Sequence, residues 1–182
     1  MQHLGTITLE TPRLLLRRFT LDDAEDMFRN WASDDEVTVF LRWPSHQSVV
    51  VTRQVVAKWV DDYDNEKNYQ WCIELKETGQ AIGSIGVVEI NERVDGAEIG
   101  YVIGRAYWHQ GITSEALAAV IDFLFRKVGF NRIEAHHDPH NPNSGKVMQK
   151  CGLKYEGTLI QASRNNRGIC DSAVYGIINP GK

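Results

Sequence analysis

The chain has 182 residues, of which 42% are hydrophobic and 24% are charged. A chain of this size and composition can bury one sizeable core with little material for a second, so we expect a single domain spanning residues 1–182. The net charge of -4 provides no basic field to attract a phosphate backbone, which argues against nucleic-acid binding and mildly favours a cationic substrate.

The three cysteines, Cys72, Cys151 and Cys170, are far apart in the sequence and include no CxxC pair. This spacing favours reduced thiols over a zinc or redox site. The first residues show neither the pattern of a secretory signal nor an apolar stretch long enough to span a membrane. We therefore expect a cytoplasmic protein with no membrane partner.

The first third of the chain predicts one strand and two helices. Residues 13–19 (RLLLRRF) read as a strand. A threonine followed by two aspartates is typical of a helix start and predicts a helix over residues 20–32. Valines and aromatic residues at helical spacing predict a second helix over residues 47–64.

Three strands are expected next, over residues 69–75, 81–90 and 98–104. Because only short turns separate them, they should form an antiparallel meander. An apolar helical pattern then runs to Gly129, which can end the helix. The strand over residues 132–137 follows this helix, and a strand-helix-strand crossover predicts that it lies parallel to the strand before the helix.

A short helix over residues 141–151 and two strands, residues 153–161 and 169–178, complete the predicted elements. The expected fold is therefore α/β. It has a mixed, mostly antiparallel, twisted sheet of about seven strands flanked by about four helices.

The stretch YWHQGITSEAL, residues 107–117, lies between the carboxyl end of a strand and the start of a helix. The first turn of a helix has N–H groups without partners, and Gly111 has no Cβ to keep an anion from them. Thr113 and Ser114 add hydroxyl donors. The stretch predicts a phosphate site, although an ordinary loop-to-helix junction with Thr113 as its cap is the alternative.

Two longer runs carry a resemblance to a known family. AEIGYVIGRAYWHQGITSEAL (residues 97–117) and NPNSGKVMQKCGLKYEG (residues 141–157) resemble the GNAT superfamily of acetyl-CoA-dependent N-acetyltransferases. The start, residues 10–27, and the end, residues 170–177, look like the RimJ/RimL-like branch, which acetylates ribosomal-protein N-termini. The resemblance implies a GNAT fold, acetyl-CoA as acetyl donor and an amine acceptor, which could be a ribosomal or other protein N-terminus. It is also compatible with a homodimer.

The resemblance places the family's pyrophosphate loop on residues 108–113, where only Gly111 fits the family pattern strictly. The loop binds mainly through backbone N–H groups, and the strand before it pairs with the pantetheine arm in the family. The implied cofactor-binding residues are Tyr101, Val102, Ile103, Trp108, His109, Gln110, Gly111, Ile112, Thr113, Ser114, Asn141 and Lys146. The alternatives are a half-buried strand for residues 101–103, a loop-ending asparagine for Asn141, and a solvated surface pair for Lys146 and Lys150.

The same resemblance suggests how the reaction would be catalysed. Glu98 lies where family members carry a general base. Met148 stands where many relatives have a tyrosine acid, so Ser144 becomes the candidate proton donor to the leaving thiolate. Strand N–H groups near Val102 would hold the oxyanion. A surface carboxylate for Glu98 and a helix cap for Ser144 remain open, as does a ping-pong role for Cys151, although a cysteine at that position more often faces a core.

No metal is expected. His136 and His137 are adjacent on a strand and would point to opposite faces, and residues 62–67 lack the glycine and the final acid of a calcium loop. The expected function is acetyl transfer to a primary amine by direct attack in a ternary complex. An idle acyl-CoA-binding module is the alternative. Candidates for the acceptor wall are Trp31, Phe40, Trp43 and residues 164–170.

Overall fold

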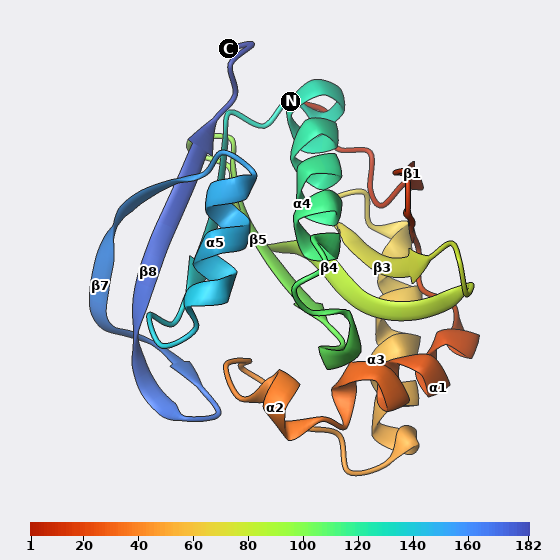
Figure 1. Cartoon of the computed structure of the whole chain (residues 1–182). Coiled ribbons are helices and arrows are strands. Elements are labelled where there is room, and N and C mark those ends of the chain that lie inside the picture. The colour runs from red at the N-terminus through yellow and green to blue at the C-terminus, as the bar shows by residue number, and fades with distance from the viewer.

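The computed structural model describes residues 1–182 and contains one continuous eight-stranded sheet, with the order β1-β2-β3-β4-β5-β6-β8-β7 (Figure 1). All neighbouring strands are antiparallel except β5 and β6, which are parallel. The strands are β1 Leu9–Glu10, β2 Leu14–Arg17, β3 Gln70–Leu75, β4 Gln80–Asn91, β5 Gly96–Ile103, β6 Arg132–His137, β7 Lys154–Asn165 and β8 Gly168–Ile178.

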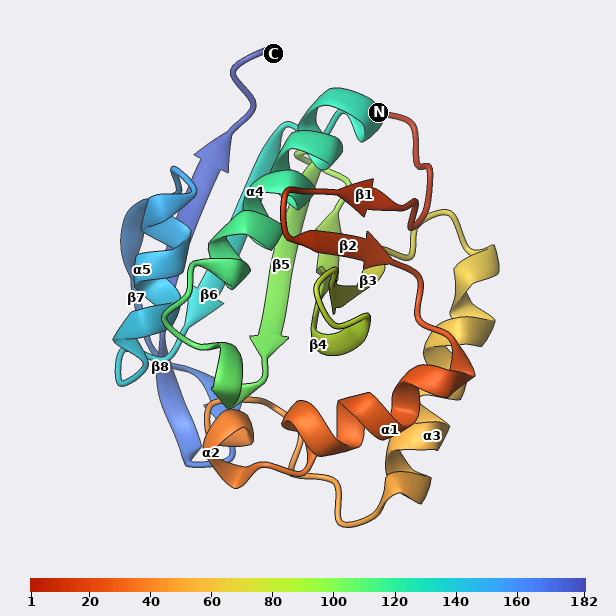
Figure 2. The same cartoon turned by 45° about the vertical axis from the view of Figure 1, so that its right-hand side comes forward.

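The helices cover both faces of the sheet (Figures 1 and 2). They are α1 Ala24–Met27, α2 Asp35–Thr38, α3 Val49–Asp61, α4 Ile112–Phe123 and α5 Pro142–Lys150. A 3₁₀ turn precedes α1, and π-helical turns extend both α1 and α4. Helices α4 and α5 lie on one face of the sheet, and α1 and α3 lie on the other. None of these helices combines the length and the apolar character that crossing a membrane requires.

The two faces of the sheet have separate cores, because successive strand residues point to opposite sides. On β3, Trp71 and Ile73 belong to a cluster of 26 buried residues that packs against α4. Cys72, between them, belongs to a cluster of 10 buried residues beneath α1 and α3. This division places α4 and α5 together on one side of β5.

The expected meander and the parallel crossover are confirmed. The counts of strands and helices were each one too low. The two-residue strand β1 and the four-residue helix α2 were not predicted, because neither is long enough to show a period in the sequence.

Strands β5 and β6 diverge along their length. They pair only at Gly96 with Arg132, Ala97 with Ile133 and Glu98 with Glu134. Beyond that point β5 continues beside β4, as far as the pair Gly83 and Ile103, while β6 continues beside β8. Residues 99–103 of β5 therefore present a backbone edge on which no strand of this sheet pairs.

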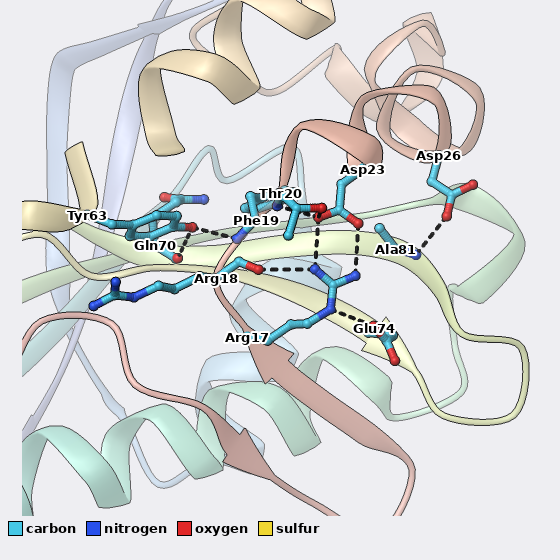
Figure 3. Close-up of polar contacts among 10 residues, drawn as sticks. All are labelled: Arg17, Arg18, Phe19, Thr20, Asp23, Asp26, Tyr63, Gln70, Glu74 and Ala81. Carbon is cyan, nitrogen blue, oxygen red and sulfur yellow. Dashed lines mark hydrogen bonds and ion pairs between the residues drawn. The ribbon is translucent and has the colours of Figure 1, made fainter. Parts of the chain in front are cut away.

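An ion-pair cluster ties the first helical segment to the sheet (Figure 3). The Arg17 guanidinium on β2 donates two hydrogen bonds of 2.8 Å to the two carboxylate oxygens of Asp23 and one of 2.5 Å to Glu74 on β3. Burial opposes ionisation of Asp23, but Arg17 and the N–H of Thr20 outweigh it and lower the pKa of this carboxyl. The cluster links the turn before α1 to strands β2 and β3.

Candidate functional site

The loop between β5 and α4 is held in place by its own side chains. The Trp108 indole N–H donates to the carbonyl oxygen of Ile103 at 3.1 Å, and the Gln110 amide donates to that of Ala106 at 2.9 Å. Gly104 lets the loop pass close to the first helical segment, since a Cβ there would lie 2.5 Å from the Asn30 carbonyl oxygen. Trp108 and Gln110 thus support the loop from within.

The backbone of this loop leaves several N–H groups without partners. Gly111 is the N-cap of α4 and has a φ of 75°, in the left-handed region that favours glycine. The N–H groups of His109, Gln110 and Gly111 have no acceptor within the protein. The first turn of α4 adds further unpaired N–H groups and the positive end of the helix dipole. The predicted phosphate cradle therefore has free donors.

Two cations flank the cradle. A Cβ on Gly111 would lie 3.5 Å from the Lys150 Nζ and 3.6 Å from an Arg13 guanidinium nitrogen. Arg13 also donates to the Gln110 carbonyl oxygen at 2.9 Å and pairs with Glu115 at 2.7 Å. Sequence reasoning missed Arg13, because 97 positions separate it from Gln110 and no local pattern connects them.

The other residues expected here have different surroundings. Lys146 is exposed on α5 and does not contact the loop. Of the two lysines on this helix, Lys150 is the one that lies beside Gly111. The Ile112 side chain is buried in the larger core, so Ile112 offers only backbone groups to the cradle. Ser114 is buried but lines the pocket beside Gly111. Thr113 is half-buried in the first turn of α4.

The divergent edge of β5 separates its side chains onto two faces. Tyr101 and Ile103 pack into the larger core near α4 and α5, whereas Val102 packs against the smaller core. The backbone of these three residues lies on the stretch of β5 that β6 no longer pairs with. This edge is free to accept an extended ligand by strand addition.

Helix α5 forms the opposite wall of this divergence. Asn141 is its N-cap residue, yet its side chain makes no capping hydrogen bond and its amide is free. Ser144 does not cap the helix either. Its hydroxyl lies 3.0 Å from the Tyr101 hydroxyl, which also donates to the Ser144 carbonyl oxygen at 3.0 Å.

Glu98 lies on the face of the sheet away from α4, in a small polar cluster. One of its oxygens is 3.9 Å from the His136 Nδ1 and 3.8 Å from the Arg42 guanidinium. The His136 Nε2 is 3.4 Å from Glu134 and is buried without a hydrogen-bond partner. Glu98, Glu134 and His136 each place one ligand atom within 4.8 Å of the others. Glu98 is the best shielded carboxylate of this cluster, since its side chain is only 14% exposed.

The hairpin between β7 and β8 closes against the segment after α2. The Asn166 side chain donates to the carbonyl oxygens of Thr38 and Trp43, each at 2.8 Å, and the Arg167 guanidinium lies 5.5 Å from the centre of the Phe40 ring. These contacts bring together the hairpin and the segment around Phe40 and Trp43, whose role as an acceptor wall stays a prediction. Trp31 was a wrong candidate for an acceptor wall, because it is fully buried in the smaller core.

Cys151 lines the pocket beside Gly111 and Lys150. Its thiol donates to the Ser114 carbonyl oxygen at 3.2 Å, and burial raises its pKa to about 11. A thiol that stays protonated at neutral pH is a poor nucleophile.

His136 and His137 do point to opposite faces, since His136 lies near Glu98 while the His137 ring contacts Tyr175 beneath α5.

Comparison with known proteins agrees with this geometry. A family model described as an acetyltransferase (GNAT) domain matches residues 13–154. The chain belongs to the GNAT acetyltransferase family. The matched segment contains the Gly111 loop, the divergence of β5 and β6, and helix α5, so the resemblance seen in the sequence is confirmed.

GNAT relatives extend over most of the chain. The uncharacterized N-acetyltransferase YoaA of Bacillus subtilis (strain 168) is 33% identical over 172 residues, which cover 94% of this chain and 97% of the relative. The ribosomal protein uS5-alanine N-acetyltransferase of Escherichia coli (strain K12) is 35% identical over 77 residues, 40% of each chain. Enzymes of the ribosomal branch are thus among its homologues.

Solved GNAT structures have the same fold. A GNAT-family acetyltransferase from Bacillus anthracis superposes with a TM-score of 0.83 at 25% identity and covers 95% of this chain and 99% of its own. The microcin C7 self-immunity acetyltransferase MccE, solved with acetyl-CoA and AMP, superposes with a TM-score of 0.82 at 21% identity and covers 92% and 93%.

Proposed function

We propose that this GNAT protein transfers an acetyl group from acetyl-CoA to a primary amine by direct attack in a ternary complex. The cradle at Gly111 carries the proposal, because it combines three consecutive free N–H groups with Arg13 and Lys150. Such a site suits the pyrophosphate of acetyl-CoA. The occurrence of acetyl-CoA in the structure of the relative MccE supports this donor.

Residues 99–103 would receive the pantetheine arm along their unpaired edge, and Asn141 would reach it from α5. Bound acetyl-CoA supplies the thioester that the amine attacks. N–H groups near Val102 would stabilise negative charge on the thioester oxygen. Ser144 would donate a hydrogen bond to the departing sulfur.

The acceptor amine would approach from the Glu98 side of the sheet. Glu98 would take its proton, because it is the least exposed carboxylate of its cluster and its nearest charged contacts, with Arg42 and His136, are no closer than 3.8 Å. The segment around Phe40 and Trp43, tied to the hairpin by Asn166, would form the wall of this pocket. Activity of the E. coli relative on ribosomal protein uS5 suggests that a protein N-terminus is among the acceptors.

A thiol-release assay with acetyl-CoA and a panel of amines tests the proposal. The panel should contain peptides with free N-termini, polyamines, amino sugars and amino acids. At least one amine should stimulate release, and Glu98→Gln should lower kcat by about 100-fold or more without changing acetyl-CoA affinity.

Glu92→Gln is the matched control, since Glu92 is an exposed carboxylate on the turn after β4, and it should retain the wild-type rate. The competing function is an idle acyl-CoA-binding module. Tight binding of acetyl-CoA with no amine-stimulated release, and no effect of Glu98→Gln, would favour that module over the enzyme.

A further inference from the structure

We propose that the Tyr101 hydroxyl positions Ser144 for catalysis, by donating to the Ser144 hydroxyl while that group hydrogen-bonds the departing sulfur. The inference rests on the proposed acetyl transfer and adds a residue to it. Tyr101 would act through Ser144 and would not contact the sulfur itself, so it is a positioning residue.

The hydrogen-bond geometry allows two arrangements of the same pair. The Tyr101 hydroxyl lies 3.0 Å from both the carbonyl oxygen and the hydroxyl oxygen of Ser144. A carbonyl can only accept, so when Tyr101 donates to it, the serine hydroxyl is free to donate back to the Tyr101 oxygen. When Tyr101 donates to the serine hydroxyl, the serine O–H can turn and donate a hydrogen bond to another acceptor. A negative sulfur beside α5 would favour the second arrangement.

The exchange moves hydrogen bonds and leaves every covalent O–H bond intact. Tyr101 is suited to it, because burial raises the pKa of its hydroxyl and keeps it protonated throughout the neutral range. A serine hydroxyl that accepts a hydrogen bond becomes a better donor in turn, since bonds in a chain polarise one another.

The location of the pair also fits this role. Tyr101 lies on the part of β5 that has separated from β6, and Ser144 lies in the first turn of α5. Their contact spans the two walls between which the pantetheine arm would lie. The Tyr101 ring packs in the larger core, so removal of the hydroxyl alone leaves the packing of the ring in place.

The test compares Tyr101→Phe, Ser144→Ala and the double variant in the thiol-release assay, with acetyl-CoA affinity and the thermal midpoint measured for each. Tyr101→Phe should lower kcat by about tenfold with little change in the KM for acetyl-CoA. The double variant should be no slower than Ser144→Ala, because Tyr101 acts only through that serine.

The matched control is Tyr155→Phe, which removes a tyrosine hydroxyl that lies 2.8 Å from the hydroxyl of Thr158 on the exposed strand β7. It should keep the wild-type kcat. A wild-type kcat for Tyr101→Phe, a loss confined to acetyl-CoA affinity or to the thermal midpoint, or additive losses in the double variant would each overturn the role of Tyr101. Absence of amine-stimulated release by the wild-type chain would instead overturn the proposed function, and the role of Tyr101 with it.

Discussion

Gly111 shows how a single residue sets the chemistry of the cradle. Its φ of 75° is strained for a β-branched residue, and a larger side chain would crowd Lys150 and Arg13, whose nitrogens lie 3.5 and 3.6 Å from the Cβ position. Gly111→Val should therefore abolish acetyl-CoA binding, which titration calorimetry can measure.

Gly79→Val is the appropriate control for Gly111→Val. Gly79 has a φ of 67° and no atom within 4 Å of its Cβ position. A valine there would therefore impose a similar backbone strain, in the turn before β4. That variant should bind acetyl-CoA with wild-type affinity. Retained affinity in Gly111→Val would refute the backbone cradle.

At the residue scale, the sequence predicted which residues lie near the site better than it predicted which contacts their side chains make. Gly111, Asn141 and Ser144 were found because local motifs contain them. Trp108 was expected among the binding residues, yet its indole N–H already donates to Ile103. The helical spacing of Lys146 and Lys150 made both possible phosphate contacts, but Arg13 reaches the loop only through tertiary packing, which no spacing in the sequence encodes.

At the scale of elements, the segment from β2 to α1 depends on the Arg17 cluster. The Asp23 side chain is 7% exposed, and its loss would leave the Arg17 charge without its main partner. Asp23→Asn should lower the free energy of unfolding at pH 7 by about 3 kcal/mol, as measured by urea denaturation.

The pH dependence of this loss has a definite sign. Because the folded-state pKa of Asp23 lies below the ordinary value of 3.8, its contribution is fully present above that value and disappears as the pH falls through the folded pKa. The difference between wild type and Asp23→Asn should therefore shrink below about pH 4. Asp122→Asn, in an exposed pair with Arg126, should change stability by less than about 0.5 kcal/mol at any pH. Equal losses in both variants would contradict the role of burial.

Periodicity predicted the longer elements because burial on one face imposes it. The sequence of residues 99–103 alternates like that of a paired strand, so only the family resemblance, through its pantetheine-binding strand, implied that β5 would have a free edge here. The divergence depends on how β4 and β8 each hold one of the two strands. The position at which the two strands separate is therefore determined by the tertiary structure of the sheet and not by the local sequence.

For the whole molecule, ligand binding and folding should be coupled. A ligand that binds only the folded chain, supplied at about 100 times its Kd, adds about 2.7 kcal/mol to stability. For a chain of this length that corresponds to a rise in Tm of roughly 5–10 °C. Acetyl-CoA should produce this shift in a thermal melt, and desulfo-CoA, which retains the pyrophosphate, should produce one of similar size. An unchanged Tm with both compounds would show that the cradle is unused.

The contacts of Asn166 have a consequence for the order in which the molecule matures. They join it to Thr38, 128 positions earlier in the chain, so this wall of the proposed acceptor pocket forms only once the β7–β8 hairpin has been made. The Gly111 cradle depends on the same hairpin, because helix α5, which carries Lys150, packs against β7 and β8. The proposed donor and acceptor sites would therefore mature together during synthesis, when the hairpin folds back onto the sheet.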